Sequence, residues 1–194
     1  MSSESFTSVG PGKALAHVRK DLRSAVKSVL LIGPWIDDYV AEQITLVASR
    51  DLNVRVLVRA ERQVELEVWT RIAAALSVFA GHWPSFEARS LERLHAKCLL
   101  IDDQIAYVGS ANWYRYSLEE SAEIVLRGPV ESVTGLQQDC ECLWESAVPI
   151  EARIGKDMPT ATGITHEVLD PLAAAALEKN PKAFVLGKKT RRSS

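Results

Sequence analysis

The sequence has no long hydrophobic segment. Its apolar runs fall well short of the roughly 20 residues that a membrane-spanning helix needs, and residues 1–8 lack the apolar core of a signal peptide. Only three cysteines are present, Cys98, Cys140 and Cys142, and an odd number without a framework spacing argues against disulfides. We therefore expect free thiols, no membrane anchor and a cytoplasmic protein.

A large excess of charge is also absent. The 194 residues contain 23 Lys and Arg against 25 Asp and Glu, and 47% are hydrophobic, which excludes disordered, collagen-like and coiled-coil chains. The charge is uneven, because residues 151–194 carry eight basic and five acidic side chains, a charge of +3, and residues 1–150 carry −5. A protein that coats DNA is usually basic over its whole body. Any contact with nucleic acid should therefore be confined to a small part of the protein surface.

Helical and strand patterns alternate over residues 13–147, and no internal repeat is present. Hydrophobic spacing predicts helices over 13–27, from Asp37 or Asp38 to about 49, over 63–79 and over 133–147. Short apolar runs bounded by turn residues predict strands over 29–32, 54–58, 86–91, 96–101, 105–108 and 122–126. We therefore expect an α/β fold with a mixed β-sheet flanked by helices.

The pattern weakens after Pro149, which predicts one domain over residues 1–150 and a C-terminal extension over 151–194. Asp170 and Pro171 suit the start of a short helix over 172–179. Residues 182–194 include five basic and no acidic side chains, so this end is expected to be mobile. Its cations either hold phosphates or are simply solvated; they include Lys188, Lys189, Arg191 and Arg192.

The most informative stretch runs from residue 95 to residue 112. It reads His95-x-Lys97-x4-Asp102 and, after six further residues, Gly109-Ser110-x-Asn112. Side chains two apart on a strand share a face, so the imidazole and the ammonium should lie together. The hydroxyl and the amide would do the same in an extended segment, and a glycine lets the backbone approach a ligand closely. Together these groups could bind one small anion.

This stretch resembles the H-x-K-x4-D signature of the phospholipase D superfamily and its downstream G-S-x-N element. Six specified residues at fixed spacing arise by chance on the order of once in a million chains of this length. The resemblance covers residues 95–112 directly and extends more loosely to Glu123 and to residues 33–38. The order of the expected elements over residues 13–147 also fits that family.

The resemblance implies a role for each signature residue. His95 would attack phosphorus and form a covalent phosphohistidine, while Lys97, Ser110 and Asn112 would hold the non-bridging oxygens. Asp102 would give mainly structural support. Glu123 would accept a hydrogen bond from the imidazole and fix its tautomer. The resemblance implies no metal ion and no other cofactor.

A complete site in this superfamily needs two such motifs, because a second histidine protonates the leaving oxygen. This sequence has one, since the remaining histidines lack a lysine two residues later; they are His17, His82 and His166. Small single-motif members of the superfamily form homodimers whose two sites meet at the twofold axis. The resemblance therefore implies a homodimer with a shared active site.

Aromatic and cationic residues follow the motif directly, at Trp113, Tyr114, Arg115 and Tyr116. They could stack on bases beside a phosphate site, or Trp113 and one tyrosine could fill the core. We expect a metal-independent nuclease acting on DNA or RNA. The alternatives are a phospholipase D-type lipid enzyme and a subunit that binds nucleic acid without cutting it.

Overall fold

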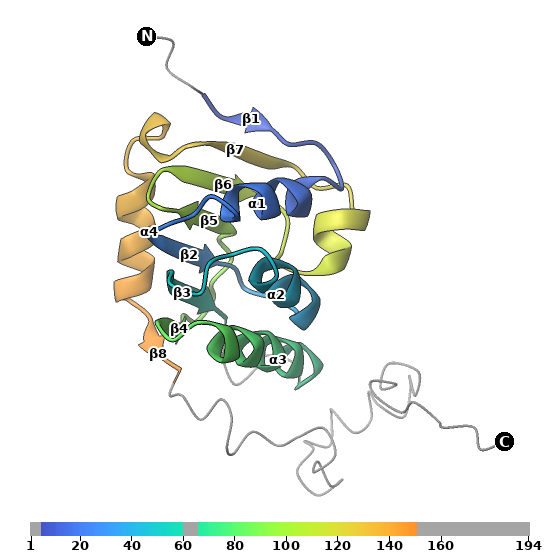
Figure 1. Cartoon of the computed structure of the whole chain (residues 1–194), viewed down its shortest axis with the longest axis vertical. Helices are drawn as coiled ribbons and strands as arrows, with labels where there is room; N and C mark the ends of the chain where they lie inside the picture. Colours follow the sequence, from blue (N-terminus) through green and yellow to red (C-terminus); the bar gives the residue numbers. More distant parts are fainter. Residues whose placement is uncertain (1–4, 60–65, 151–194) are drawn as a thin grey trace, which may run out of the picture. The chain divides into compact units, whose positions relative to one another are not determined.

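The computed structural model of the chain describes residues 5–59 and 66–150. These residues form a mixed sheet with helices on both faces, as Figure 1 shows, so the expected α/β fold class is confirmed. The strands lie in the order β1-β7-β6-β5-β2-β3-β4-β8. Their bounds are β1 Thr7–Ser8, β2 Ser28–Ile32, β3 Asn53–Val58, β4 Phe86–Ser90, β5 Cys98–Ile101, β6 Ile105–Gly109, β7 Val125–Pro129 and β8 Val148–Pro149.

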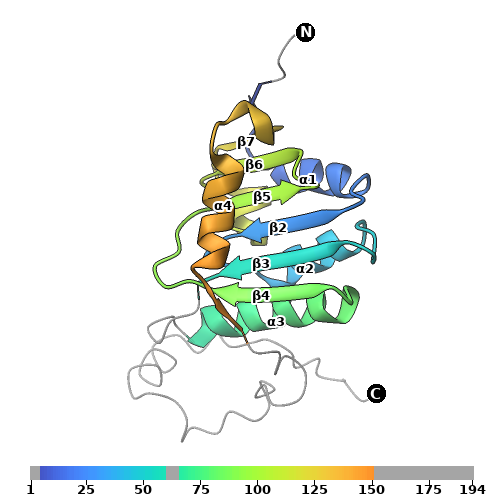
Figure 2. The same ribbon diagram turned by 90° about the vertical axis from the view of Figure 1, so that its left-hand side faces the viewer.

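Three helices cover one face of the sheet and one covers the other. Figure 2 shows α1 Ala14–Leu22, α2 Asp38–Thr45 and α3 Leu66–His82 behind the sheet and α4 Leu136–Glu145 in front of it. A π-helical segment, η1 Tyr116–Glu120, and a short 3₁₀ turn, η2 Val130–Ser132, complete the helical elements of the described residues. The helix α2 joins β2 to its parallel neighbour β3, and α3 joins β3 to β4.

The central strands are apolar on both faces because both faces are covered. In β2, Leu31 packs in the core under α1, α2 and α3. Its neighbours Leu30 and Ile32 face the other way and pack with residues of α4. Cys98 and Cys140 belong to this second core and are free thiols whose Sγ atoms lie 3.7 Å apart.

Several element ends differ from the predictions for physical reasons. The first helix ends at Leu22 rather than at residue 27, because the backbone N–H groups of Val26, Lys27 and Ser28 donate to the Asp102 carboxylate. The strand expected from residue 122 begins at Val125, because Ile124 donates its backbone N–H to a serine hydroxyl instead of a strand carbonyl. The strand expected from residue 96 begins at Cys98.

Other differences are smaller. The helix α2 ends at Thr45 rather than near residue 49, α3 continues through Gly81 to His82, and α4 is shorter than the expected 133–147. The short edge strands β1 and β8 and the segment η1 were not expected. The predicted helix over 172–179 and the predicted basic end lie outside the described residues. The predicted domain boundary at residue 150 lies at the edge of the described range.

In residues 5–59 and 66–150, no helix combines the length and the apolar character needed to cross a bilayer.

Candidate active site

The strand directions bring separate signature residues to one end of the sheet. The strand β5 is antiparallel to both β2 and β6. Residues just before β5 therefore lie beside residues just after β2 and β6. Residues just before β7 reach the same end, because β7 is antiparallel to β6. This end holds His95, Lys97, Ser110, Asn112 and Glu123.

Lys97 is buried beside an exposed imidazole. Its side chain is 8% exposed, and Nζ donates to the backbone oxygen of His95 at 2.8 Å. The same Nζ lies 3.1 Å from each ring nitrogen of His95. Burial lowers the pKa of Lys97, and the nearby Glu123 carboxylate opposes part of that effect. The ammonium is thus fixed in place while the ring remains open to a ligand.

Ser110 connects the end of β6 to the segment before β7. Its Oγ donates to Oε2 of Glu123 at 2.5 Å and accepts from the backbone N–H of Ile124 at 3.1 Å. At Gly109, a Cβ would lie 2.2 Å from the backbone oxygen of Ile124. The glycine is therefore required for the close approach of two protein segments, and its contact with a substrate stays a prediction.

Glu123 is bound by two hydroxyl groups. Besides the bond from Ser110, Oε1 accepts a hydrogen bond of 2.8 Å from Oγ of Ser117. These two bonds lower the pKa of Glu123, with a smaller contribution from the Lys97 charge. Among the described residues, the carboxylate forms no hydrogen bond with His95, contrary to the role that the resemblance implied. Its contacts hold it at the site as a charged neighbour of Lys97.

Sequence reasoning missed Ser117, which is 2% exposed and lies on η1. A π-helical segment has neither the period of an α-helix nor that of a strand, so no periodic signal marks the inward side of Ser117. The start of η1 is held by Asp37, whose carboxylate accepts from the backbone N–H groups of Val40 and Arg115 at 2.9 and 3.0 Å. Asp37 thereby caps α2, as predicted, and also fixes the segment that carries Ser117.

Asn112 is buried and has unused hydrogen-bonding capacity. Its Oδ1 is inaccessible to solvent and has no partner within the described residues. Buried polar groups in proteins are nearly always paired. A half-turn of the amide exchanges this oxygen for the NH₂ donor, so Asn112 can offer either group to a ligand.

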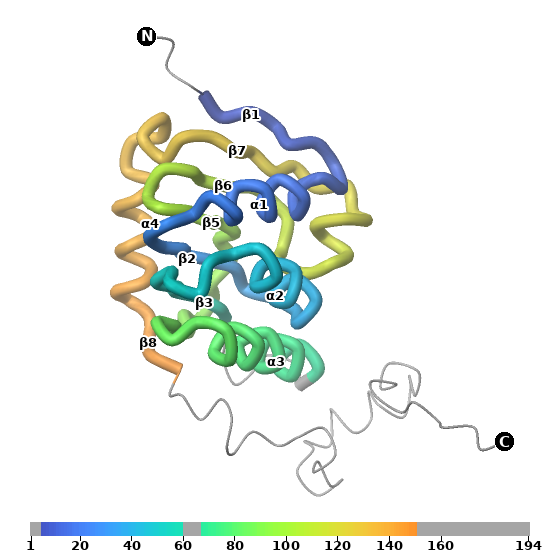
Figure 3. Tube along the Cα trace, in the orientation of Figure 1, coloured from blue at the N-terminus to red at the C-terminus, as the bar shows by residue number. Residues whose placement is uncertain are grey.

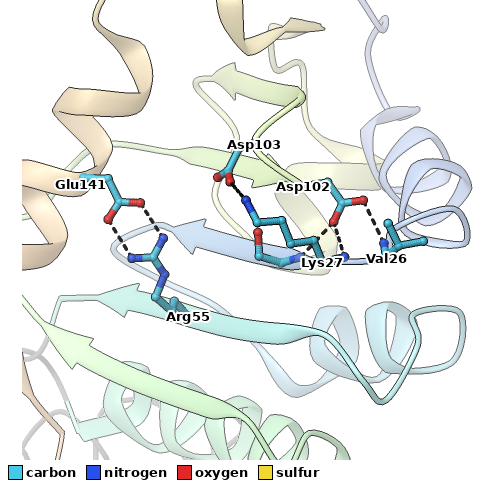
Figure 4. Close-up of polar contacts among 7 residues, drawn as sticks. Val26, Lys27, Arg55, Asp102, Asp103 and Glu141 are labelled. Carbon is cyan, nitrogen blue, oxygen red and sulfur yellow. Dashed lines mark hydrogen bonds and ion pairs between the residues drawn. The ribbon is translucent and has the colours of Figure 1, made fainter.

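Asp102 lies at the opposite end of β5 from this cluster. Its carboxylate accepts from the backbone N–H groups of Val26, Lys27 and Ser28 at 2.9, 2.7 and 2.9 Å. Figure 4 shows the carboxylate beside Val26 and Lys27. Burial raises the pKa of Asp102, but the three donors outweigh it and lower the pKa overall. This geometry fits the support role implied by the resemblance and gives Asp102 no contact with the site.

The four residues after the motif occupy different environments. Trp113 is 3% exposed and donates its indole N–H to the backbone oxygen of Ile32 at 2.8 Å. It is a core residue and not a substrate contact, which corrects that prediction. Arg115 is exposed and paired with Glu119 and Glu120. Tyr114 is half-buried, and Tyr116 is 60% exposed.

The cations Lys188, Lys189, Arg191 and Arg192 lie outside the described residues. In residues 5–59 and 66–150, no three His, Cys, Asp or Glu side chains form a group suited to a metal ion.

Comparison with known proteins gives a family and a fold. Residues 18–144 match the family model described as "Cardiolipin synthase, PLD-like domain". The structure of NucT from Helicobacter pylori is 21% identical, covers 76% of this chain and 98% of its own, and has a TM-score of 0.60. Nuc from Salmonella typhimurium, a phospholipase D family member, is 14% identical with the same coverages and a TM-score of 0.62.

A third similar structure is the phosphatidylserine synthase of Haemophilus influenzae, which is 11% identical with a TM-score of 0.63. The match covers 91% of this chain and 44% of that enzyme. No curated protein sequence matched the chain. The family model spans well over half of the sequence, including the signature residues at one end of the sheet. On these grounds, the chain belongs to the phospholipase D superfamily.

Proposed function

We propose that this chain is a metal-independent nuclease that acts as a homodimer through a phosphohistidine intermediate. The observation that carries the proposal is the exposed imidazole of His95 against the buried ammonium of Lys97. A buried ammonium is a fixed positive charge in a medium where charge interactions are strong. It can stabilise the negative charge that develops on a phosphodiester under attack.

In the first chemical step, a ring nitrogen of His95 attacks phosphorus. The new P–N bond forms as the bond to the leaving oxygen breaks, and that oxygen takes a proton from a second imidazole. Water then attacks phosphorus, returns a proton to the second imidazole and breaks the P–N bond. Lys97, Ser110 and Asn112 would hold the non-bridging oxygens throughout.

The second imidazole would come from another copy of the chain. Beside the site, Ile124 is 68% exposed, and Leu126, two residues later, is 39% exposed. Exposed apolar side chains next to one another favour contact with a partner. A twofold axis near β7 would bury them and would bring a second His95 close to the first.

Two comparisons favour nucleic acid as the substrate. The nuclease neighbours NucT and Nuc match this chain over 98% of their own length, so each is about the size of the described domain. The lipid enzyme matches over only 44% of its length. A second candidate is a lipid phosphodiesterase, which is supported by the cardiolipin synthase description of the family model and by the phosphatidylserine synthase.

A substrate panel tests the proposal. The purified chain and its His95→Ala variant are incubated with single-stranded DNA, duplex DNA, RNA and phosphatidylcholine vesicles in excess EDTA. We expect cleavage of at least one nucleic acid that depends on His95. Turnover of the lipid alone would establish the second candidate, and binding of nucleic acid without cleavage would indicate a non-cleaving subunit.

A further inference from the structure

The helix α1 presents a row of cations to solvent. Lys13 precedes the helix, and Lys20 follows it seven residues later, at the spacing that places both side chains on one helix face. Arg23 continues the row three residues after Lys20. Lys13, Lys20 and Arg23 are all exposed, whereas the inner face of α1 is formed by buried residues such as Leu15 and Val18.

The acid of α1 offsets this row only through the electrostatic interaction of Lys20 with Asp21. The one acid of the helix, Asp21, faces inward, where its carboxylate accepts from Arg127 at 2.6 and 3.0 Å and from the Tyr107 hydroxyl. Lys13, Lys20 and Arg23 form no ion pair within the described residues.

The nearest acids of η1 are already engaged. The Tyr39 hydroxyl donates to Glu119, and Arg115 pairs with both Glu119 and Glu120. Acidic residues outnumber basic ones by 18 to 10 over residues 28–150. The cations of α1 thus form a positive surface on a domain that is otherwise acidic.

This surface adjoins the candidate active site. Ala14 and Val18, on the inner face of α1, line a small cavity together with Lys97, Gly109 and Trp113. The helix therefore packs directly behind the buried lysine, and Figure 3 shows it on the face that also carries α2 and α3. Ala14 lies at the start of α1, so Lys13 is the cation of the row nearest the site. Lys20 and Arg23 continue the row along the helix towards Val26, whose backbone N–H binds Asp102 at the other end of β5.

We propose that the α1 row, formed by Lys13, Lys20 and Arg23, binds backbone phosphates that flank the cleaved phosphate of a nucleic acid strand. Nine helical residues span about 14 Å. Phosphates of one strand of a duplex follow one another every 3.4 Å along the axis, so about four of them would face α1. A phospholipid has no such series of phosphates, and the row would therefore select a polyanion. The inference rests on the nuclease function proposed above.

The test compares Lys20→Gln/Arg23→Gln with a control pair, Arg50→Gln/Arg71→Gln, that removes the same charge elsewhere. Binding of a fluorescent 20-nucleotide single strand is measured over a range of salt concentrations, and cleavage of bis(4-nitrophenyl) phosphate is measured alongside. Loss of two phosphate contacts should lower the slope of log K against log salt by about 1.4. Affinity should fall at least fivefold for the α1 variant, while hydrolysis of the small diester stays unchanged for both variants.

Equal effects of the two variants, or an unchanged salt slope in the α1 variant, would overturn the inference. Failure of the wild-type chain to bind any oligonucleotide would overturn it as well. A wild-type chain that binds the strand through α1 but cleaves only the small diester or a lipid would retain the α1 surface. That result would remove the nuclease proposal alone.

Discussion

Ser117 donates a hydrogen bond of 2.8 Å from Oγ to Oε1 of Glu123, from a position that is 2% exposed. The other oxygen of the carboxylate accepts from Ser110. The two hydroxyl groups thus fix the orientation of Glu123 and keep it ionised, because bonds to the charged form lower its pKa. The ionised carboxylate in turn raises the pKa of Lys97 against the opposing effect of burial.

The first prediction follows from that coupling. Glu123→Gln removes the charge that favours the Lys97 ammonium, so the already lowered pKa of Lys97 should fall further. In the proposed mechanism, activity requires the Lys97 ammonium and is lost as pH rises through this pKa. The alkaline limb of kcat/KM should therefore move to lower pH in Glu123→Gln.

Ser117→Ala serves as the control. This variant keeps the charge of Glu123, so it should move the alkaline limb of kcat/KM less than Glu123→Gln does. Turnover of Glu123→Gln at neutral pH should also fall by more than any loss of folded protein. An alkaline limb at the wild-type pH in Glu123→Gln would show that the carboxylate does not act on Lys97.

The second prediction concerns the chemistry at His95. His95→Ala should lower kcat by more than about a thousandfold, because the nucleophile is lost. Lys97→Arg should also be poor, since a planar guanidinium does not replace a compact ammonium in a buried position. Activity of the wild-type chain should survive excess EDTA, and vanadate should inhibit it. Loss of activity on chelation, with recovery on adding Mg²⁺ or Zn²⁺, would require a different mechanism.

The third prediction is that two chains form one working unit. Light scattering should give about twice the chain mass of 21.4 kDa. Ile124→Glu should produce monomers and lose activity, because it places a charge in the proposed contact. Val26→Glu is the matched control, since Val26 is 82% exposed and lies beside Asp102 at the far end of β5.

Mixed dimers sharpen that test. A dimer of one wild-type chain and one His95→Ala chain should be almost inactive, because one imidazole attacks and the other donates the proton. A fully active wild-type monomer would refute the shared site.

The fourth prediction uses Asp102 to separate support from catalysis. Asp102→Asn weakens the acceptor of three backbone N–H groups and should lower the free energy of unfolding at pH 7 by about 1–3 kcal/mol. The pKa of Asp102 is lower in the folded chain than its value of about 3.9 in the unfolded chain. Its contribution to the free energy of unfolding is therefore present above about pH 3.9 and is lost as pH falls through the pKa of the folded chain. Urea unfolding should therefore show a smaller difference in the free energy of unfolding between Asp102→Asn and wild type at pH 3 than at pH 7.

Asp103→Asn is the neighbouring control. Asp103 pairs with Lys27 at 2.5 Å, but that lysine is largely exposed. An exposed ion pair contributes little to stability, so the free energy of unfolding of this variant should be close to that of wild type. Equal destabilisation by the two variants would contradict the support role of Asp102.

The sequence predicted the order of the main strands and helices, because the helices have a clear apolar period and the strands are short apolar runs bounded by turn residues. It also located the signature, since residue identity and spacing alone define it. Strand ends near the site were less predictable, because side chains there replace backbone partners, as Ser110 does for Ile124.

Trp113 shows a second limit of the sequence. An aromatic residue beside a catalytic motif suits either stacking or packing, and only the position of Ile32 and Gly33 across the fold decides the outcome. Ser117 shows a third limit, since its role depends on a π-helical segment that Asp37 holds from another part of the chain.

The last prediction concerns selectivity beside the phosphate. Trp113 is buried and Arg115 is engaged by two glutamates, which leaves Tyr116 as the accessible aromatic ring of this segment. Stacking of a base on such a ring contributes roughly 1–3 kcal/mol. Tyr116→Ala should therefore weaken oligonucleotide binding by a factor of about five to one hundred. Cleavage of a small chromogenic phosphodiester should stay near the wild-type rate, because that substrate has no flanking base.

Tyr114→Ala is the comparison, since Tyr114 is half-buried and offers less of its ring to a base. Fluorescence anisotropy with a labelled single strand measures both variants, and circular dichroism checks that each is folded. A larger loss of affinity for Tyr114→Ala than for Tyr116→Ala would assign the stacking ring to Tyr114 instead. If neither variant affects binding or cleavage of oligonucleotides, and a lipid is turned over faster than any nucleic acid, the nuclease proposal fails. The proposed site would then act on phospholipids, because the roles proposed for the signature residues involve only the phosphodiester common to both substrates.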